Sequence, residues 1–114
     1  ALTAMSITCD AAIIYAERHA ELAQKMPRQE PDPKRKEELK KIAEICRWLP
    51  AHAPRTYWVA IQMYWFVHLG TITELIGWDA MNPGHFDQHL APIYEKDQEE
   101  GILTRAEAKE LMSC

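Results

Sequence analysis

Apolar residues recur along the first half of the chain at intervals of three and four, which is the spacing of one face of an α-helix. The first such pattern covers about residues 6–26. The second covers about residues 33–49, where Asp32 can cap the helix, Pro33 suits its first turn and Pro50 ends it. Both segments are therefore predicted to be amphipathic helices. Their apolar positions are Ile7, Ala11, Ile14, Tyr15, Leu22 and Met26 in the first and Leu39, Ile42, Ala43, Cys46 and Leu49 in the second.

A third helix is predicted from Thr56, which can cap it, to about Ile76, just before Gly77. Unlike the first two, it carries apolar residues on every side, whereas a surface helix shows a single apolar stripe. These residues are Tyr57, Trp58, Val59, Ile61, Met63, Tyr64, Trp65, Phe66, Val67, Leu69, Ile72, Leu75 and Ile76. Such a helix has to be covered on all sides.

A membrane span and burial inside a larger protein both provide such cover. Gln62, His68 and Glu74 interrupt the apolar run, and no cluster of Lys or Arg lies just outside both of its ends. These features disfavour a membrane span. A chain of 114 residues leaves much of its surface exposed. We therefore expect this chain to be part of a longer protein.

After a loop at residues 78–85, the pattern predicts a short turn, a helix from about Pro92 to Glu100 and a stop at Gly101. Thr104 and Glu107 form a capping-box pattern that predicts a last helix. No segment shows the alternation typical of a strand. The sequence thus predicts an all-α segment of about five helices forming a single partial domain, at about residues 6–26, 33–49, 56–76, 92–100 and 105–114.

The charge and the cysteine content limit the classes of binding partner and the cellular compartment that the sequence predicts. Thirteen Lys and Arg against seventeen Asp and Glu give a net charge of −4, which argues against nucleic acid and anionic membranes as partners. Cys9, Cys46 and Cys114 lie far apart and form no Cys-x-x-Cys pair. The N-terminus lacks the pattern of a signal peptide, so we predict a cytoplasmic protein.

Two patterns resemble binding sites but are better explained otherwise. His85 and His89 have the spacing of a zinc-binding helix, but Phe86 stands where the general base would be and no third ligand is evident. We predict no metal site. The basic residues from Lys34 to Lys41 alternate with glutamates at helical spacing, which favours a solvated, salt-bridged helix face over a phosphate site.

Cys46 and Asp79 are candidates for reactive groups. Cys46 lies on an apolar helix face, where a buried structural thiol is expected rather than a nucleophile. Asp79 follows the apolar helix and lies between Trp78 and Met81, so partial loss of hydration is expected. Its carboxylate can be a substrate ligand or base, or it can cap backbone N–H groups or pair with an arginine. The residues alone leave these alternatives open.

Three stretches together resemble the glycyl radical enzymes, in the branch of pyruvate formate-lyase-like dehydratases and lyases. They are EICRWLPAHAPRT at residues 44–56, AIQMYWFVHLG at 60–70 and WDAMNPGHFDQHL at 78–90. Enzymes of this family are several hundred residues long and are built on a ten-stranded α/β barrel surrounded by helices. The resemblance implies that this chain is a helical part of such an enzyme, on the N-terminal side of the catalytic cysteine.

The resemblance also implies radical chemistry in the full-length enzyme. A partner activase that uses S-adenosylmethionine and an iron–sulfur cluster installs a glycyl radical, which generates a thiyl radical that abstracts hydrogen from a small-molecule substrate. None of the three cysteines lies in the Gly-Cys-Val type loop of the family, and none of the four glycines lies in its Arg-Val-x-Gly type loop. This chain is therefore expected to contain no catalytic residue, to bind no cofactor and to be inactive alone, with the remainder of the enzyme as its partner. A homodimer is one assembly expected at full length.

Trp78, Asp79 and Ala80 are the substrate-binding residues that the resemblance implies. The matching stretch in pyruvate formate-lyase resembles Gly-Ala-Ala, a small apolar surface. Asp79 would instead suit a substrate hydroxyl or ammonium group, which favours a dehydratase or another eliminating lyase. His85 stands where relatives commonly carry arginine, so an anion contact at that position is not carried over.

The leading hypothesis is thus a portion of a glycyl radical lyase or dehydratase that eliminates water, an amine or a similar group, with this chain supplying scaffold and part of the substrate pocket. One alternative is a free-standing helical module that binds a partner protein without catalysis. A second alternative is an enzyme of the formate acetyltransferase type.

Overall fold

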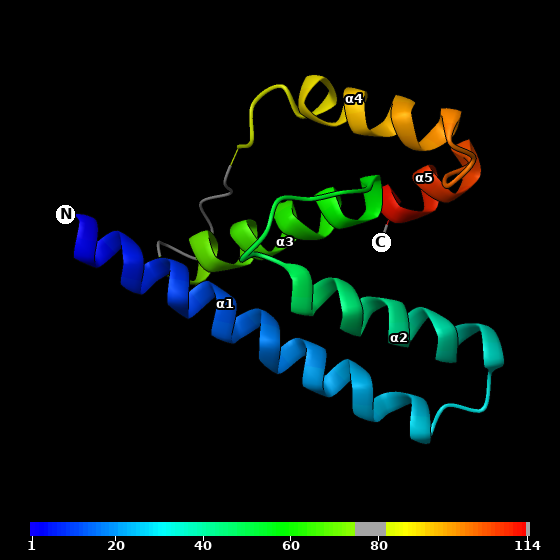
Figure 1. Cartoon of the computed structure of the whole chain (residues 1–114), viewed down its shortest axis with the longest axis horizontal. Helices are drawn as coiled ribbons and strands as arrows, with labels where there is room; N and C mark the ends of the chain where they lie inside the picture. The colour runs from blue at the N-terminus through cyan, green and yellow to red at the C-terminus, as the bar shows by residue number, and fades with distance from the viewer. Residues whose placement is uncertain (75–81, 114) are drawn as a thin grey trace. The chain divides into compact units, whose positions relative to one another are not determined.

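The computed structural model describes residues 1–74 and 82–113. These residues form α1 (Leu2–Lys25), a 3-10 turn η1 (Met26–Arg28), α2 (Pro33–Trp48), α3 (Tyr57–Glu74), α4 (Phe86–Glu99) and α5 (Arg105–Ser113) (Figure 1). They contain no strand, which agrees with the predicted all-α segment. They divide into two compact units, Ala1–Ala53 and Pro54–Cys114. Whether the whole chain is one partial domain stays a prediction.

In the first unit, α1 packs against α2 through small side chains. Ala16, Ala20 and Ala23 are buried on α1, at the same spacing as Leu39, Ala43 and Cys46 on α2. Small residues allow two helices to approach closely, which increases the dispersion contacts between them. Leu39, Ala43, Cys46 and Leu49 of the predicted apolar face are thus buried, whereas Ile42 is only partly buried and Ile45 is buried in addition.

The apolar face predicted for α1 is not the face that α1 buries. Ile7, Ile14 and Leu22 are all at least half exposed, although they are larger and more apolar than the buried alanines. The prediction relied on large apolar residues at helical spacing. The contact with α2 instead buries small residues, the three alanines of α1. The first unit therefore carries exposed apolar side chains along α1.

The ends and the outer face of α2 follow the sequence pattern. The backbone N–H of Lys34 donates to Oδ1 of Asp32 at 3.0 Å, as expected of the predicted cap. Glu38 forms ion pairs with Lys34 at 3.8 Å and with Arg35 at 2.9 Å, and Lys40 pairs with Glu37 at 2.6 Å. This is the predicted salt-bridged, solvated helix face, and it leaves these basic side chains paired with carboxylates.

In the second unit, α3 packs against α4 and α5. The core consists of Tyr57, Ala60, Leu90, Leu103 and Ala108, with Ile61, Tyr64, Phe86, Ile93, Tyr94 and Leu111 packed around it. On α3, Trp65 remains 52% exposed and Val67 remains 46% exposed. The two neighbouring helices therefore leave part of the apolar surface of α3 uncovered, as the sequence pattern indicated.

Helix α4 begins at Phe86, six residues before the start predicted at Pro92, and Pro92 lies inside it. The prediction was wrong because proline lacks the N–H that a helix interior needs and usually marks a helix start. Here Phe86, Leu90 and Ile93 have helical spacing and pack on the core, so their burial outweighs the missing hydrogen bond.

The last helix begins as the capping-box pattern predicts. The backbone N–H of Thr104 donates to Oε2 of Glu107 at 2.8 Å, and the N–H of Glu107 donates to Oγ1 of Thr104 at 3.2 Å. Before it, Gly101 has a φ of 69°, a conformation that favours glycine, and ends α4 as predicted. Among the described residues, no helix is long and apolar enough to cross a membrane.

Candidate functional site

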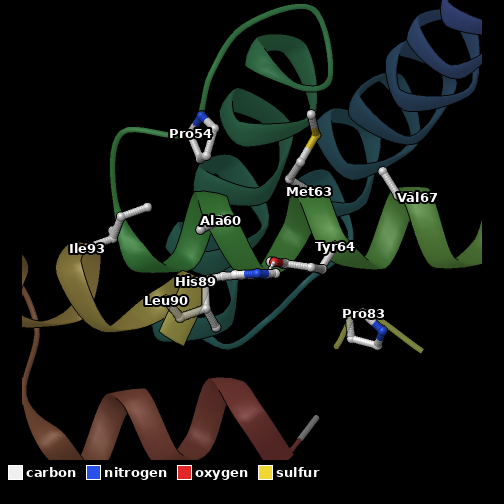
Figure 2. Close-up of a pocket in the computed structure, with 9 residues that line it drawn as sticks. All are labelled: Pro54, Ala60, Met63, Tyr64, Val67, Pro83, His89, Leu90 and Ile93. Carbon is white, nitrogen blue, oxygen red and sulfur yellow. Dashed lines mark hydrogen bonds between the residues drawn. The ribbon is translucent and has the colours of Figure 1, made fainter. Parts of the chain in front are cut away.

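An apolar hollow lies between α3 and α4 in the second unit, with a volume of about 340 Å³ (Figure 2). Seven of the residues that line it have apolar side chains: Pro54, Ala60, Met63, Val67, Pro83, Leu90 and Ile93. Tyr64 and His89 complete the lining and contribute its polar atoms. The hollow is partly open to solvent and combines an apolar wall with one tyrosine–histidine pair.

Tyr64 of α3 and His89 of α4 point toward one another across the hollow (Figure 2). The hydroxyl oxygen of Tyr64 lies 2.6 Å from Nδ1 of His89. When the hydroxyl donates to Nδ1, the proton of the neutral imidazole is on Nε2. The ring of Phe86 packs edge-on against Tyr64 with centroids 4.7 Å apart. The hydrogen bond between Tyr64 and His89 joins the beginning of α4 to the middle of α3.

His85 and His89 make different contacts in the structure. His85 is the residue just before α4, and its main-chain oxygen accepts from the backbone N–H of His89 at 3.1 Å. The ring of His89 is instead joined to Tyr64. Within residues 1–74 and 82–113, no group of three His, Cys, Asp or Glu side chains could hold a metal ion.

The two described cysteines differ in their surroundings. Cys46 is 2% exposed in the contact between α1 and α2, and this burial raises the pKa of its thiol above the ordinary value of 9.0. Loss of hydration disfavours the thiolate, which is the nucleophilic form. Cys46 is therefore a structural thiol, as the sequence indicated. Cys9 is exposed on α1.

Trp78, Asp79 and Ala80, the predicted substrate-binding residues, lie outside the described part of the chain. The turn that follows them is described. The backbone N–H of Gly84 donates to Oδ1 of Asn82 at 2.9 Å, and Gly84 has a φ of 74°. Pro83, between these residues, lines the hollow. The described end of the predicted substrate loop thus borders the hollow.

Asp97 is a further candidate, one that the sequence pattern did not single out. It is 1% exposed, and its Oδ2 accepts from the backbone N–H of Tyr57 at 2.7 Å. No hydrogen-bond partner for its Oδ1 is found among the residues that the structure describes. One signal was present in the sequence, since Asp97 continues the buried face of Phe86, Leu90 and Ile93 at helical spacing. A carboxylate on such a face is a candidate for a buried structural or functional group.

Comparison with known proteins places the chain among much longer enzymes. Residues 1–114 match the family described as pyruvate formate lyase-like. The trans-4-hydroxy-L-proline dehydratase of Clostridioides difficile is 55% identical over 113 residues, which are 99% of this chain and 14% of that protein. Its crystal structure with the substrate bound matches 97% of this chain with a TM-score of 0.92.

Two further relatives differ in activity or origin. The isethionate sulfite-lyase of Nitratidesulfovibrio vulgaris is 42% identical over 113 residues, again 99% of this chain and 14% of the relative. A glycyl radical enzyme from Archaeoglobus fulgidus matches 90% of this chain and 13% of its own, with a TM-score of 0.83 and 39% identity. The chain spans about 14% of the length of the curated relatives that it matches, and the helices of its described residues correspond to a helical segment of these larger enzymes.

Proposed function

The chain belongs to the pyruvate formate lyase-like family, and we propose on this basis that the full-length protein is a glycyl radical dehydratase or lyase. The observation that carries the proposal is the 55% identity to a trans-4-hydroxy-L-proline dehydratase over nearly the whole chain. The isethionate sulfite-lyase relatives support the broader class, because they also eliminate a group from a small polar molecule.

Residues 1–114 would supply scaffold and one wall of the substrate pocket in this enzyme. The radical, housed elsewhere in the full-length protein and installed by an S-adenosylmethionine and iron–sulfur activase, would supply hydrogen-atom abstraction from the substrate. The described cysteines fit no such role, because Cys46 is buried with a raised pKa and Cys9 lies on the helix α1, not in a cysteine loop. The 114-residue chain alone would be inactive.

Asp79 is the residue of this chain that we assign to the substrate. Its carboxylate would accept a hydrogen bond or a proton from a hydroxyl or ammonium group, and Trp78 and Ala80 would border the same part of the pocket. trans-4-Hydroxy-L-proline carries both groups, a hydroxyl and a secondary ammonium. We therefore propose this molecule, which would lose water, as the first substrate to test.

The test uses the full-length enzyme, activated without oxygen, with the radical quantified by electron paramagnetic resonance. We expect loss of water from trans-4-hydroxy-L-proline, and a decrease in kcat/KM of about 10²-fold or more for Asp79→Ala at unchanged radical content, the usual size of an acid–base contribution. Asp87→Ala is the matched control, because Asp87 is exposed in the first turn of α4.

Three outcomes would contradict parts of the proposal. An activated enzyme that turns over neither hydroxyproline nor isethionate nor a vicinal diol would remove the dehydratase and lyase assignment. Turnover of pyruvate and coenzyme A instead would favour the formate acetyltransferase alternative. Full activity of Asp79→Ala would remove only the pocket role of this residue.

A non-catalytic helical module that binds a partner protein remains the second candidate function. The exposed apolar side chains of Trp65 and Val67 on α3 favour it. The absence of any radical after treatment with activase, together with a stable complex between the full-length protein and another protein through α3, would support this alternative.

A further inference from the structure

Gly70 lies inside α3, where glycine is an unfavourable residue. Helix formation removes more backbone freedom from glycine than from any other residue, so a glycine inside a helix usually has a specific reason. One such reason is a positive φ, which Gly84 and Gly101 have and Gly70 does not. The backbone conformation therefore does not explain the glycine at position 70.

Packing among the described residues does not explain it either. Gly70 is exposed, and a Cβ added to it would meet no described atom within 4 Å apart from its chain neighbours and the backbone of its own helix. A further reason for a glycine is the close approach of another backbone, since the missing Cβ leaves room for it. The described residues leave the space next to Gly70 open.

This open space adjoins the apolar hollow between α3 and α4. Met63, Val67 and Gly70 are separated by four and three positions, so they lie on one face of α3. Met63 and Val67 line the hollow together with Leu90 and Ile93 of α4 (Figure 2). Val67 remains 46% exposed. We call these five residues the α3–α4 surface. It combines a partly open apolar hollow with a position that has no side chain, about one turn further along α3.

The chemistry of the α3–α4 surface fits apolar protein side chains. None of the residues that line the hollow carries a carboxylate, an ammonium or a guanidinium group. Its two polar side chains, Tyr64 and His89, are hydrogen-bonded to each other at 2.6 Å. A charged ligand would lose hydration there with little compensation. An apolar side chain would instead exchange contact with water for contact with the apolar wall.

The relatives indicate where such side chains come from. This chain spans about 14% of the length of a curated relative, and the solved structure of that kind of enzyme contains the same segment with a TM-score of 0.92. The fold of the segment is therefore kept inside a protein about seven times longer. A segment of the same polypeptide is held near the surface by the chain itself, whereas a second copy or another protein has to associate first. These facts favour the remainder of the same polypeptide as the occupant.

We propose that Gly70 marks the point where an apolar segment of the same polypeptide, outside residues 1–114, crosses α3. The backbone of this segment contacts α3 at Gly70, and one of its apolar side chains fills the hollow beside Met63 and Val67. The contact holds the α3–α4 surface against the remainder of the full-length protein. It concerns packing alone and depends on neither the substrate nor the radical.

Substitutions of Gly70 in the full-length protein test the crossing, because an open and a covered surface give shifts of opposite sign. On an open helix surface Gly70→Ala raises the Tm, since alanine favours the helix. Under a closely packed backbone the added methyl group clashes instead. We expect Gly70→Ala to lower the Tm by about 2 °C or more, and Gly70→Leu, which favours a helix nearly as well, to lower it further. A raised or unchanged Tm of Gly70→Ala would overturn the proposal.

Glu44→Leu is the matched control for the added leucine side chain. Glu44 is exposed on α2, at helical spacing from the ion pair between Glu37 and Lys40. We expect the Tm of this variant to stay within about 1 °C of that of the unchanged protein. A decrease as large as that of Gly70→Leu would mean that position 70 is not special, and it would contradict the crossing.

Photo-crosslinking identifies the segment that covers the hollow, and it also serves if Gly70→Leu does not fold. Photo-methionine, a diazirine analogue similar in size to methionine, is incorporated into the full-length protein of otherwise unchanged sequence. After illumination, mass spectrometry identifies the peptides that are joined to the peptide containing Met63. We expect a peptide of the same chain from outside residues 1–114. A mixture of isotopically light and heavy protein shows whether the joined peptides come from one chain.

The other crosslinking results would each overturn the proposal. Reaction of Met63 only with water, or only with peptides of residues 1–114, would mean that the remainder of the chain does not cover the hollow. Crosslinks between light and heavy chains would assign the α3–α4 surface to a second copy, and crosslinks to a different protein would assign it to a separate partner. Neither experiment needs turnover, so a failure of the proposed function would leave both tests valid.

Discussion

At the scale of single residues, burial separates side chains that the sequence presents as equivalent. Cys9 and Cys46 both lie on helices, but Cys46 is enclosed between two helices and Cys9 is exposed. Burial raises the pKa of Cys46 and also that of Tyr57, where the nearby Tyr94 adds a smaller contribution in the same direction. Both groups are therefore held in the neutral form over a wider pH range than in the unfolded chain.

The pH dependence of Cys46 follows from the direction of this shift. A pKa that is raised on folding gives a stability contribution that is complete below the unfolded value of 9.0 and is lost as the pH rises through the folded value. We expect iodoacetamide to modify Cys9 at neutral pH and Cys46 only at higher pH or after unfolding. Mass spectrometry of the labelled peptides measures both. Equal labelling of the two at pH 7 would contradict the buried position of Cys46.

Asp97 illustrates a residue whose role the sequence could not supply. Its helical spacing placed it on a buried face, but its partner is a backbone N–H 40 positions away. Local patterns report neighbours within one or two turns, so a hydrogen bond between separate helices is invisible to them. For Asp79, by contrast, the neighbouring residues in the sequence indicated a substrate role, and that role stays a prediction.

At the scale of elements, helix ends with local caps were predictable and the end that depends on tertiary packing was not. The cap of α2 by Asp32 and the capping box at Thr104 both involve residues within three positions of each other. The start of α4 instead depends on the packing of Phe86 and Leu90 against α3, which outweighs Pro92. The alanine face of α1 was missed because it depends on the shape of α2.

Removal of the N-cap of α2 is expected to lower the free energy of unfolding. In Asp32→Ala the N–H of Lys34 loses its acceptor, and we expect the free energy of unfolding to fall by about 1 kcal/mol. Chemical denaturation monitored by circular dichroism measures the change. Asp10→Ala is the matched control, because Asp10 is exposed inside α1 and alanine is favourable there. A larger loss for Asp10→Ala than for Asp32→Ala would contradict the capping assignment.

At the scale of the whole molecule, the apolar surface exceeds what the described helices cover. Large apolar side chains remain exposed on α1 and on α3, which is typical of surfaces that pack against other protein. The amino-acid sequence of α3 already predicts this surplus, since its apolar residues form no single stripe. Relatives about seven times longer provide the additional protein in their own folds.

The exposed side chains of α3 predict how the 114-residue chain behaves in isolation. Covering the exposed half of a large apolar side chain contributes roughly 0.8–1.5 kcal/mol, so the two side chains together contribute roughly 1.5–3 kcal/mol. We therefore expect Trp65→Gln with Val67→Thr to weaken self-association of the isolated chain by about 10-fold or more, measured by sedimentation equilibrium. Glu95→Gln, an exposed change on α4, is the control. In the full-length protein the double change should instead lower the yield of folded protein.

Pro92 interrupts the backbone hydrogen bonds of α4 and divides the helix into an early and a late part. Its ring cannot donate to the carbonyl one turn earlier, so the part from Phe86 to Ala91 is held to the rest of the helix by fewer hydrogen bonds. Opening a short segment costs less free energy than unfolding the whole unit. This early part carries His89 and Leu90, which form one wall of the hollow. Loss of this early part of α4 is therefore expected to need less free energy than loss of the contact between Asp97 and the start of α3.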